Sequence, residues 1–118
     1  MVELHTLLVQ LLDENQAENI ETLDVRVATT LVDHIIFCTG KNTRHVKSLA
    51  AKAMESIKKN PDFKFQCKAE GLEDGQWVLV DCDLCMLHIM LHDIRDHYSI
   101  EKLWHGLITR AKLSDHES

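Results

Sequence analysis

The spacing of hydrophobic residues in the first part of the chain predicts one helix followed by two strands. Leucines at positions 4, 7, 8, 11 and 12 recur at helical spacing and predict an amphipathic helix that ends near residues 14–18. Residues 23–27 alternate apolar with charged side chains, which is typical of a strand with one face in water. Residues 33–38 become continuously apolar after their first positions, as expected of a central strand covered on both faces.

A second helix is the clearest element of the pattern. Asn42 or Thr43 can cap it after a turn at residues 39–43, and Lys58, Lys59 and Pro61 mark its end. Its apolar stripe consists of Val46, Leu49, Ala50, Ala53, Met54 and Ile57.

The remaining pattern predicts three strands and a last helix. Residues 63–70 alternate, residues 71–75 form a loop, and residues 76–81 and 85–91 form a hairpin. Ser99 is the expected N-cap of the last helix, with an apolar stripe of Ile100, Leu103, Trp104, Leu107, Ile108 and Ala111. The order α-β-β-α-β-β-β-α predicts an α/β (α+β) fold, a mixed β-sheet of about five strands packed by helices. We expect a single domain over residues 1–111 and a flexible tail over residues 112–118.

Composition narrows the class of protein. The 118 residues are 45% hydrophobic and 27% charged, an ordinary globular mixture that excludes disorder and collagen-like structure. Neither a secretory signal nor an apolar run of membrane-spanning length is present, so we expect a cytoplasmic protein with reduced cysteines and no membrane partner. The net charge of −6 argues against an overall basic footprint for nucleic acid and favours a basic partner.

The charge is distributed unevenly along the chain. From Lys41 to Lys59 there are six basic residues and one acidic residue, whereas residues 70–96 carry seven acids and one base. Either stretch can be a plain solvated face. The sequence leaves open whether the basic stretch contacts ribonucleic acid.

Two clusters resemble metal sites. Cys82, Cys85 and His88, with His92 following, have zinc-ligand residue types, but strand alternation would turn Cys85 and His88 to opposite faces. The zinc site therefore stays an alternative to plain packing.

Asp81 and Asp83 could hold Mg²⁺ in a nucleotidyltransferase-like enzyme, although Asp83 falls in the predicted hairpin turn. No third carboxylate is evident on a neighbouring strand. We therefore expect no catalytic centre, no metal and no cofactor, and keep the magnesium enzyme as a second alternative.

The more informative feature is a surface. Trp77 opens a predicted strand, and Arg95, His97 and Tyr98 precede the helix that carries Trp104. Tryptophan, tyrosine and arginine dominate binding hot spots, although packing at the edge of the core would also explain them.

An ordered set of short motifs covers residues 1–105 and resembles one family. The motifs are Leu23-Asp24-Val25-Arg26, Asp33-x-x-Ile36-x-Cys38-Thr39-Gly40-x-x-Thr43-Arg44-x-Val46-Lys47, Glu70-Gly71, Trp77-Val78-Leu79-Val80-Asp81, Leu87-His88-Ile89 and Arg95-x-x-Tyr98-x-x-Glu101-x-Leu103-Trp104. In this order they resemble the ribosomal silencing factors, the Iojap-related proteins of bacteria and organelles. The chain departs from the family pattern at His34, at Cys82-Asp83-Leu84 and at Ser99.

The resemblance implies a function. Family members bind the large ribosomal subunit through ribosomal protein L-fourteen, block its association with the small subunit and repress translation during starvation. Their fold is a nucleotidyltransferase-like domain without catalytic residues, and we expect a monomer or homodimer when the chain is free. The family motif places partner-binding residues at Glu70, Gly71, Trp77, Asp81, His88, Arg95, Tyr98, Leu103 and Trp104.

Overall fold

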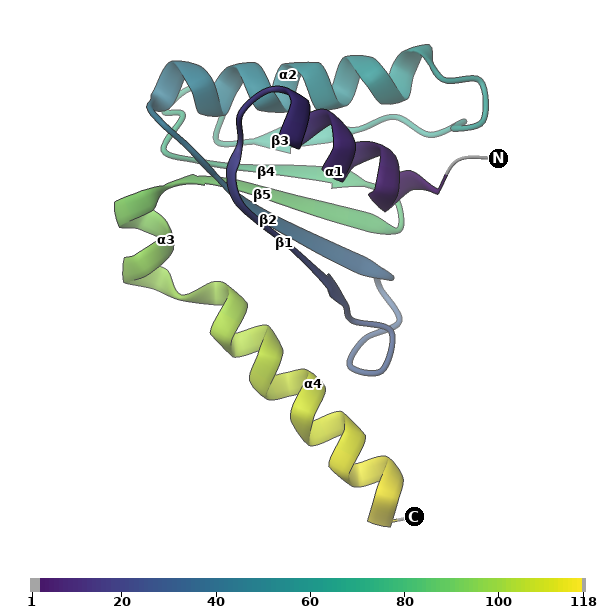
Figure 1. The fold of residues 1–118 in the computed structure, drawn as a ribbon. Helices are drawn as coiled ribbons and strands as arrows, with labels where there is room; N and C mark the ends of the chain where they lie inside the picture. Colours follow the sequence, from purple (N-terminus) through teal and green to yellow (C-terminus); the bar gives the residue numbers. More distant parts are fainter. Residues whose placement is uncertain (1–2, 118) are drawn as a thin grey trace.

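The computed structural model describes residues 3–117, with side chains up to Ser114, and confirms the mixed α/β architecture (Figure 1). In chain order the elements are α1 (Leu4–Glu14), β1 (Glu18–Asp24), β2 (His34–Gly40), α2 (Thr43–Lys59), β3 (Lys68–Glu70), β4 (Trp77–Cys82), β5 (Cys85–Leu91), α3 (His92–Tyr98) and α4 (Ile100–Glu117). The five strands form one sheet in the order β1-β2-β5-β4-β3. Strands β2 and β5 are parallel, and the other neighbours are antiparallel.

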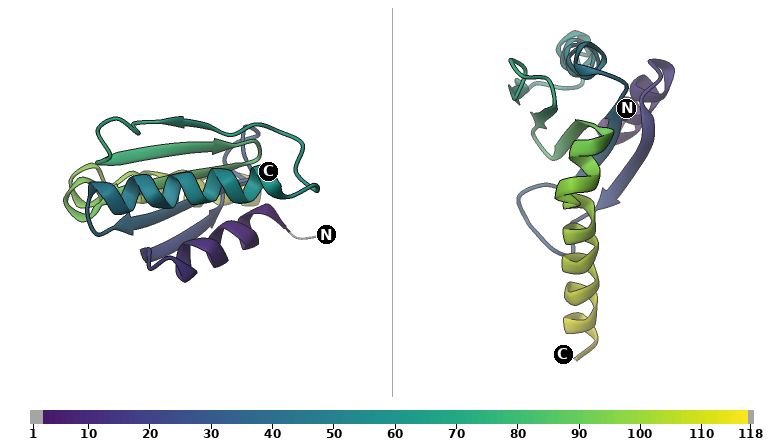
Figure 2. Two further views of the ribbon diagram at one scale, coloured as in Figure 1. Left: turned by 90° about the horizontal axis from the view of Figure 1, so that it is seen from above. Right: turned by 90° about the vertical axis from the view of Figure 1, so that its left-hand side faces the viewer.

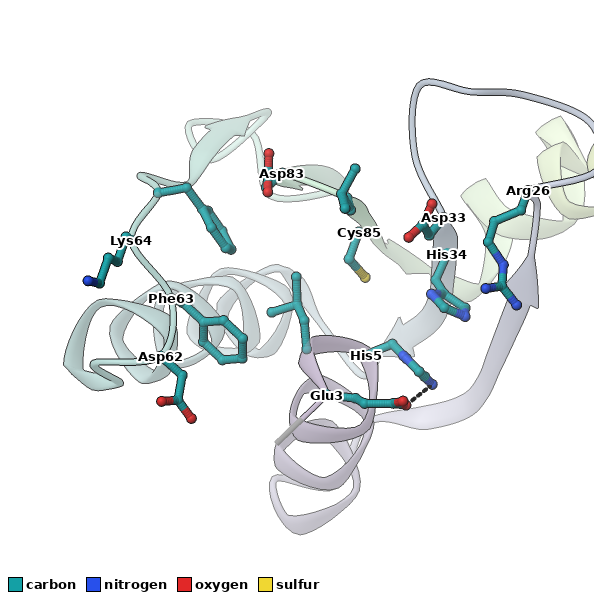
Figure 3. Close-up of a pocket in the computed structure, with 13 residues that line it drawn as sticks. Glu3, His5, Arg26, Asp33, His34, Asp62, Phe63, Lys64, Asp83 and Cys85 are labelled. Carbon is teal, nitrogen blue, oxygen red and sulfur yellow. Dashed lines mark ion pairs between the residues drawn. The ribbon is translucent and has the colours of Figure 1, made fainter. Parts of the chain in front are cut away.

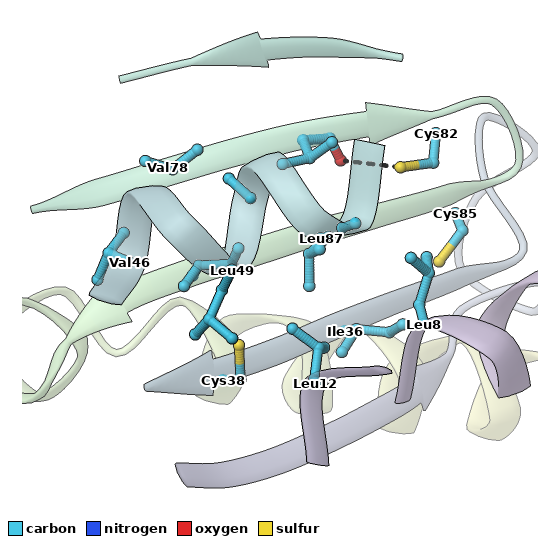
Figure 4. Close-up of a cluster of buried hydrophobic side chains, with 14 of the residues drawn as sticks. Leu8, Leu12, Ile36, Cys38, Val46, Leu49, Val78, Cys82, Cys85 and Leu87 are labelled. Atoms are coloured by element: carbon cyan, nitrogen blue, oxygen red, sulfur yellow. Dashed lines mark hydrogen bonds between the residues drawn. The ribbon is translucent and has the colours of Figure 1, made fainter. Parts of the chain in front are cut away.

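Helices α1 and α2 lie side by side on one face of the sheet (Figures 1 and 2). Beneath them is the main core, where side chains of α1 and α2 meet those of β2, β4 and β5 (Figure 4). The fully buried members include Leu8, Leu12, Ile36, Val46, Leu49, Val78, Leu87 and Ile89. Burial of this apolar area is the main stabilising contribution to a domain of this size.

Helix α2 forms as its sequence predicts. The Oδ1 atom of Asn42 accepts a hydrogen bond from the backbone N–H of His45 at 2.8 Å, which caps the first turn. Five of the six stripe residues are buried, and Met54 packs at the edge of the core. The helix begins close to the end of β2 because Gly40 has no side chain: a Cβ there would lie 2.5 Å from Cγ2 of Val46.

The opposite face of the sheet has a smaller core. Trp104 and Ile108 of α4 pack with residues of β1, β2 and the loop between them, including Leu23, Val25 and Ile35. The helix then diverges from the sheet (Figure 1). On the β5, β4 and β3 side, Trp77, Leu79 and Met86 are only half-buried, and this part of the sheet is called the open face below.

The predicted strand at residues 23–27 is placed too late. Strand β1 spans Glu18–Asp24, because its ladder with β2 ends where Asp24 pairs with His34. Arg26 then folds back so that its guanidinium binds the Asp24 carboxylate, and the chain turns. The apolar positions of the alternating pattern at Leu23 and Val25 are nevertheless buried, because both side chains pack in the second core.

The predicted strand at residues 63–70 is too long. Only Lys68–Glu70 pairs with β4. Phe63 and Phe65, whose rings are 6.0 Å apart, pack against the main core without a strand partner. The alternation of apolar and polar residues over residues 63–70 therefore indicates which side chains pack on the core, but it does not indicate a hydrogen-bonded strand along the whole segment.

The end of the chain differs from the prediction in three respects. A short helix, α3, precedes α4, and Ser99 between them has a left-handed backbone with φ of 48°. Ser99 directly precedes α4, and its carbonyl accepts the N–H of Lys102, but its hydroxyl donates to the carbonyl of Asp96, so the side chain closes α3 and does not cap α4. Helix α4 continues beyond Ala111 to Glu117, while the flexibility of residues 112–118 stays a prediction and Ser118 lies outside the described residues.

Within residues 3–117, no helix is both long enough and apolar enough to span a membrane.

Candidate functional site

Trp77 and His88 lie side by side on the open face. Strand register pairs Trp77 with Met90 and His88 with Leu79, so the two rings are diagonal neighbours on adjacent strands. The indole Nε1–H of Trp77 donates to Nδ1 of His88 at 3.0 Å. The histidine therefore orients the indole at the edge of the sheet.

Aromatic rings continue this contact from the core to the surface. His88 stacks on Phe37 at 5.1 Å with an angle of 8° between the rings, and Trp77 packs on Tyr98 at 5.3 Å. Phe37 and His88 are buried, Trp77 is half-buried, and Tyr98 is 56% exposed. These four residues are called the aromatic cluster, and its outer end is accessible to a partner.

His88 is held as a neutral ring. Burial lowers the pKa of His88 to about 4. Because Nδ1 accepts the hydrogen bond from Trp77, the neutral ring carries its proton on Nε2. His88 therefore positions Trp77 and offers a partner no positive charge at neutral pH.

Arg95 holds the last two helices against the sheet. Its Nε and Nη2 donate to the two carboxylate oxygens of Glu101 at 2.7 and 2.8 Å. Nη1 donates to the carbonyl of Asn19 at 2.7 Å and to the hydroxyl of Thr39 at 3.0 Å. With 11% of its side chain exposed, Arg95 joins α3, α4, β1 and β2 from inside and is poorly placed to contact a partner.

The Arg95–Glu101 pair is an electrostatic anchor. Hydrogen bonds from Arg95 lower the pKa of Glu101 to about 2, and the carboxylate raises the pKa of Arg95. Both side chains are largely covered, and Glu101 is the closest compensation for the charge of Arg95, with Glu21 at 4.0 Å as a second carboxylate.

Gly71 acts through its backbone. Its φ is +88°, and a Cβ at this position would lie 2.1 Å from the carbonyl oxygen of Trp77. Glycine therefore lets the loop after β3 lie directly against the first residue of β4.

The other motif residues divide between surface and packing. Glu70 and Asp81 are exposed at the β3 and β4 edge, opposite Leu79 and Lys68 respectively. On α4, Leu103 is 61% exposed. The neighbouring Trp104 packs on the second core.

Acidic residues flank Trp77 and Tyr98 along the chain. Glu73 and Asp74 lie in the loop that leads to Trp77, and Asp93 and Asp96 lie on α3, which ends at Tyr98. All four are exposed. An aromatic patch with an acidic rim suits a basic protein surface.

Sequence reasoning missed residues that complete this surface. Leu79 and Met86 lie beside the motif residues on the open face, and both are half-buried. The alternation of side chains in β4 and β5 shows which residues share the open face, but only once the pairing register of the two strands is known. Glu101 stands within the family motif. It lies six positions after Arg95, and this spacing does not indicate an ion pair.

The zinc alternative is not supported by the geometry. Cys82 and Cys85 point into the main core, whereas His88 points to the opposite face, and His92 is exposed on α3. Among the described residues, no group of three or more histidine, cysteine, aspartate or glutamate side chains could hold a metal ion.

The backbone geometry also gives the magnesium alternative no support. Asp81 points to the open face, whereas Asp83 has a left-handed backbone, with φ of 61°, in the β4–β5 turn. The two carboxylates therefore do not share the regular alternation of one strand.

A hollow of about 850 Å³ lies at the other end of the strands, near the start of β5 (Figure 3). The rings of His5 and His34 stack in it at 3.9 Å. Asp33, Asp83 and Lys64 also line the hollow. Trp77 pairs near the opposite end of β5, so this hollow is separate from the aromatic cluster.

Comparisons with known proteins agree with the motifs. The model of the family "Ribosomal silencing factor during starvation" matches residues 1–118. The chain is 36% identical over 105 residues to the ribosomal silencing factor of Chromobacterium violaceum, covering 88% of this chain and 84% of that protein. It is 30% identical over 101 residues to the mouse "Mitochondrial assembly of ribosomal large subunit protein 1", covering 83% of this chain and 43% of that protein.

Solved structures show the same fold. A crystal structure of a Chromobacterium violaceum protein matches with a TM-score of 0.80 and 34% identity, over 86% of this chain and 83% of the other. A Bacillus halodurans protein matches with a TM-score of 0.74 and 27% identity, over 86% and 92%. The fold, the ordered motifs and the family match lead to one conclusion: this chain belongs to the ribosomal silencing factor family, whose members are regulators and not enzymes.

Proposed function

We propose that this chain represses translation by binding the large ribosomal subunit through ribosomal protein L-fourteen. Bound there, the domain occupies space that the small subunit needs and blocks association of the subunits. The family name links this activity to starvation. The observation that carries the proposal is the aromatic cluster with its acidic rim on the open face.

The contact surface in this proposal is the exposed end of the aromatic cluster together with neighbouring apolar residues. Tyr98 and Leu103 are 56% and 61% exposed, and exposed apolar side chains are available to a partner. Aromatic anchors in such a patch supply most of the binding energy of a typical interface. The acidic rim speeds the encounter with a basic ribosomal protein and makes the association rate fall as salt rises.

The indole of Trp77 is a preorganised anchor. Its hydrogen bond to His88 and its packing on Tyr98 fix its orientation before a partner arrives. A fixed side chain loses less conformational entropy on binding, which favours affinity. Arg95 supports the same surface indirectly, because it fixes α3, and with it Tyr98, to β1 and β2.

Contact with ribosomal RNA through α2 is a second part of the proposal. Lys41, Arg44 and Lys58 are exposed along the helix and its approach. Within the described structure, Lys52 binds the side chain of Asn15, and Lys59 pairs with Glu55. Phosphate contacts by the first three residues would steepen the dependence of binding on salt concentration.

The setting of this function is the cytoplasm, with a monomer or homodimer as the free form and no membrane partner. The name of the mouse relative ties that protein to assembly of the mitochondrial large subunit. We extend large-subunit association to this chain, and a role in ribosome biogenesis is compatible with it.

Sedimentation with purified ribosomal subunits tests the proposal. The chain should move with the large subunit and should shift the population from joined to separate subunits. An isolated L-fourteen protein should compete for the chain. Failure to co-sediment, or unchanged subunit association at saturating chain, would overturn the proposal.

A further inference from the structure

Three thiols lie close together at one end of the sheet, with Cys82 on β4, Cys85 on β5 and Cys67 just before β3. The β4–β5 register pairs Cys82 with Cys85. The β3–β4 ladder ends where Lys68 pairs with Asp81, and Cys67 and Cys82 are the next residues beyond that pair. The Sγ atoms of Cys67 and Cys82 are 3.7 Å apart.

The position of this pair suits a disulfide. The two cysteines directly follow the last ladder pair of two antiparallel strands, where opposed Cα atoms are about 4.5–5.5 Å apart. That separation falls within the range that disulfides span. Cys67 precedes a strand of only three residues at the edge of the sheet, so its backbone can adjust as the sulfurs approach.

The two sulfurs differ in access. Cys67 is half-buried and lines an open hollow of about 310 Å³ between the end of α2 and residues 63–67. Cys82 is fully buried behind it, and so are Cys38 and Cys85. A small oxidant therefore reaches Cys67 first and finds a second thiol in contact with it.

We propose that Cys67 and Cys82 are a redox-active pair, which a hydroperoxide converts to an intramolecular disulfide. The Cys67 thiolate attacks one peroxide oxygen, an S–O bond forms, the O–O bond breaks, and water leaves after protonation. The Cys82 sulfur then attacks the sulfenic sulfur of Cys67. An S–S bond forms, the S–O bond breaks, and the departing hydroxide takes the Cys82 proton as water. Two thiols and one hydrogen peroxide thus give one disulfide and two waters, with two electrons passing to the peroxide.

The surroundings of the pair determine its rate. Burial raises the pKa of the Cys67 thiol and that of Cys82. Since the thiolate is the nucleophile, oxidation is slow at neutral pH and accelerates as pH rises. The product fastens residue 67 to β4 and so holds the short edge strand β3 in place.

The test uses the full chain, reduced and then exposed to hydrogen peroxide. Remaining thiols are alkylated, and the chain is digested without reductant and mapped by mass spectrometry. The expected main product is a peptide pair joined through Cys67 and Cys82, which dithiothreitol separates. A chain that stays reduced overturns the proposal, and so does a main product that is a Cys82–Cys85 bond, a chain-to-chain bond or an oxidised Cys67 acid.

Variants give an independent check. Cys67→Ser removes the accessible thiol at a half-buried position and should abolish disulfide formation, whereas Cys38→Ala, whose sulfur lies elsewhere in the main core, should leave the yield unchanged. Amide hydrogen exchange of the oxidised wild-type chain should slow at Lys68–Glu70. Peroxide-dependent disulfide formation at the wild-type rate in Cys67→Ser would contradict the assignment.

Discussion

Trp77 donates its indole N–H to Nδ1 of His88 across 3.0 Å, so a buried neutral histidine orients the ring at the edge of the open face. Protonation of Nδ1 would remove the acceptor of this hydrogen bond, so the indole would lose the contact that fixes its orientation. Burial lowers the pKa of His88 to about 4, so acid breaks the contact only when the buried ring is protonated.

We predict that His88 makes stability depend on pH between about 6.5 and about 4. Its pKa is about 4 in the folded chain against 6.5 for a free histidine, so the unfolded chain binds the proton first. Stability is fully present above pH 6.5, and up to about 3 kcal/mol is lost as pH falls to 4. Urea unfolding across this range measures the slope.

Two variants isolate this contribution. His88→Gln keeps an acceptor for the indole but cannot titrate, and should flatten the slope. His92→Gln replaces a histidine that is exposed on α3, and this variant should keep the wild-type slope of stability against pH. Identical slopes in wild type and His88→Gln would contradict the assignment.

A second prediction concerns the Arg95–Glu101 pair. Glu101→Gln leaves the covered guanidinium of Arg95 without its hydrogen-bonded carboxylate, with only Glu21 at 4.0 Å, and should lower the free energy of unfolding by up to about 3 kcal/mol at pH 7. The folded pKa of Glu101 is depressed from 4.5 to about 2. Its stabilising contribution is therefore present above pH 4.5 and is lost as pH falls toward 2.

Glu55 provides the matched control. Its pair with Lys59 is exposed on α2, where solvent screens the charges, so Glu55→Gln should change stability little. Equal losses in the two variants would show that Arg95 does not anchor the helices.

A third prediction compares two glycines. Gly71→Ala places a Cβ 2.1 Å from the Trp77 carbonyl at a positive φ and should destabilise the chain by at least about 1 kcal/mol. Gly106→Ala, in the exposed middle of α4 with nothing within 4 Å, should stabilise it by up to about 1 kcal/mol. Thermal unfolding separates the two directions, and a harmless Gly71→Ala would rule out a steric need for glycine.

The sequence predicts best those elements in which the capping residues, the apolar pattern and the buried side chains all indicate the same helix or strand. In α2, the Asn42 cap, the apolar stripe and the terminal lysines all indicate the same helix, and the structure contains it. The hairpin of β4 and β5 also follows its pattern, with Asp83 and Leu84 at the turn.

Prediction failed where tertiary contacts decide the backbone. Helix α3 contains one half-buried apolar residue, Ile94, and the exposed Tyr98, so its sequence shows no apolar stripe at helical spacing. Strand β1 is largely polar because it is an edge strand, and its ladder partner lies in β2. The partner-binding role of Arg95 stays a prediction, while its contacts with Glu101, Thr39 and Asn19 exist only in the folded chain and leave no mark in the sequence.

The fourth prediction concerns the contact surface. Tyr98→Ala removes an exposed ring with little loss of core packing and should weaken large-subunit binding by at least about 30-fold if it is a hot spot. Leu84→Ala trims an apolar side chain that is 49% exposed at the opposite end of β4 and β5, and should bind like wild type. Equal affinities in a folded Tyr98→Ala chain would place the contact elsewhere.

Trp77→Phe complements that variant. It keeps a ring at the position but removes the donor to His88, so binding should fall while the fold persists. Circular dichroism checks the fold, and titration of labelled large subunits gives the affinity. Wild-type affinity would limit Trp77 to packing.

The most direct test of the central claim is light scattering of subunit association with increasing amounts of the chain. We predict that the chain, preincubated with large subunits, prevents the rise in scattering when small subunits are added. Tyr98→Ala should require a higher concentration to do so, and Leu84→Ala should match wild type. Undiminished association at concentrations that saturate the large subunit would contradict the account.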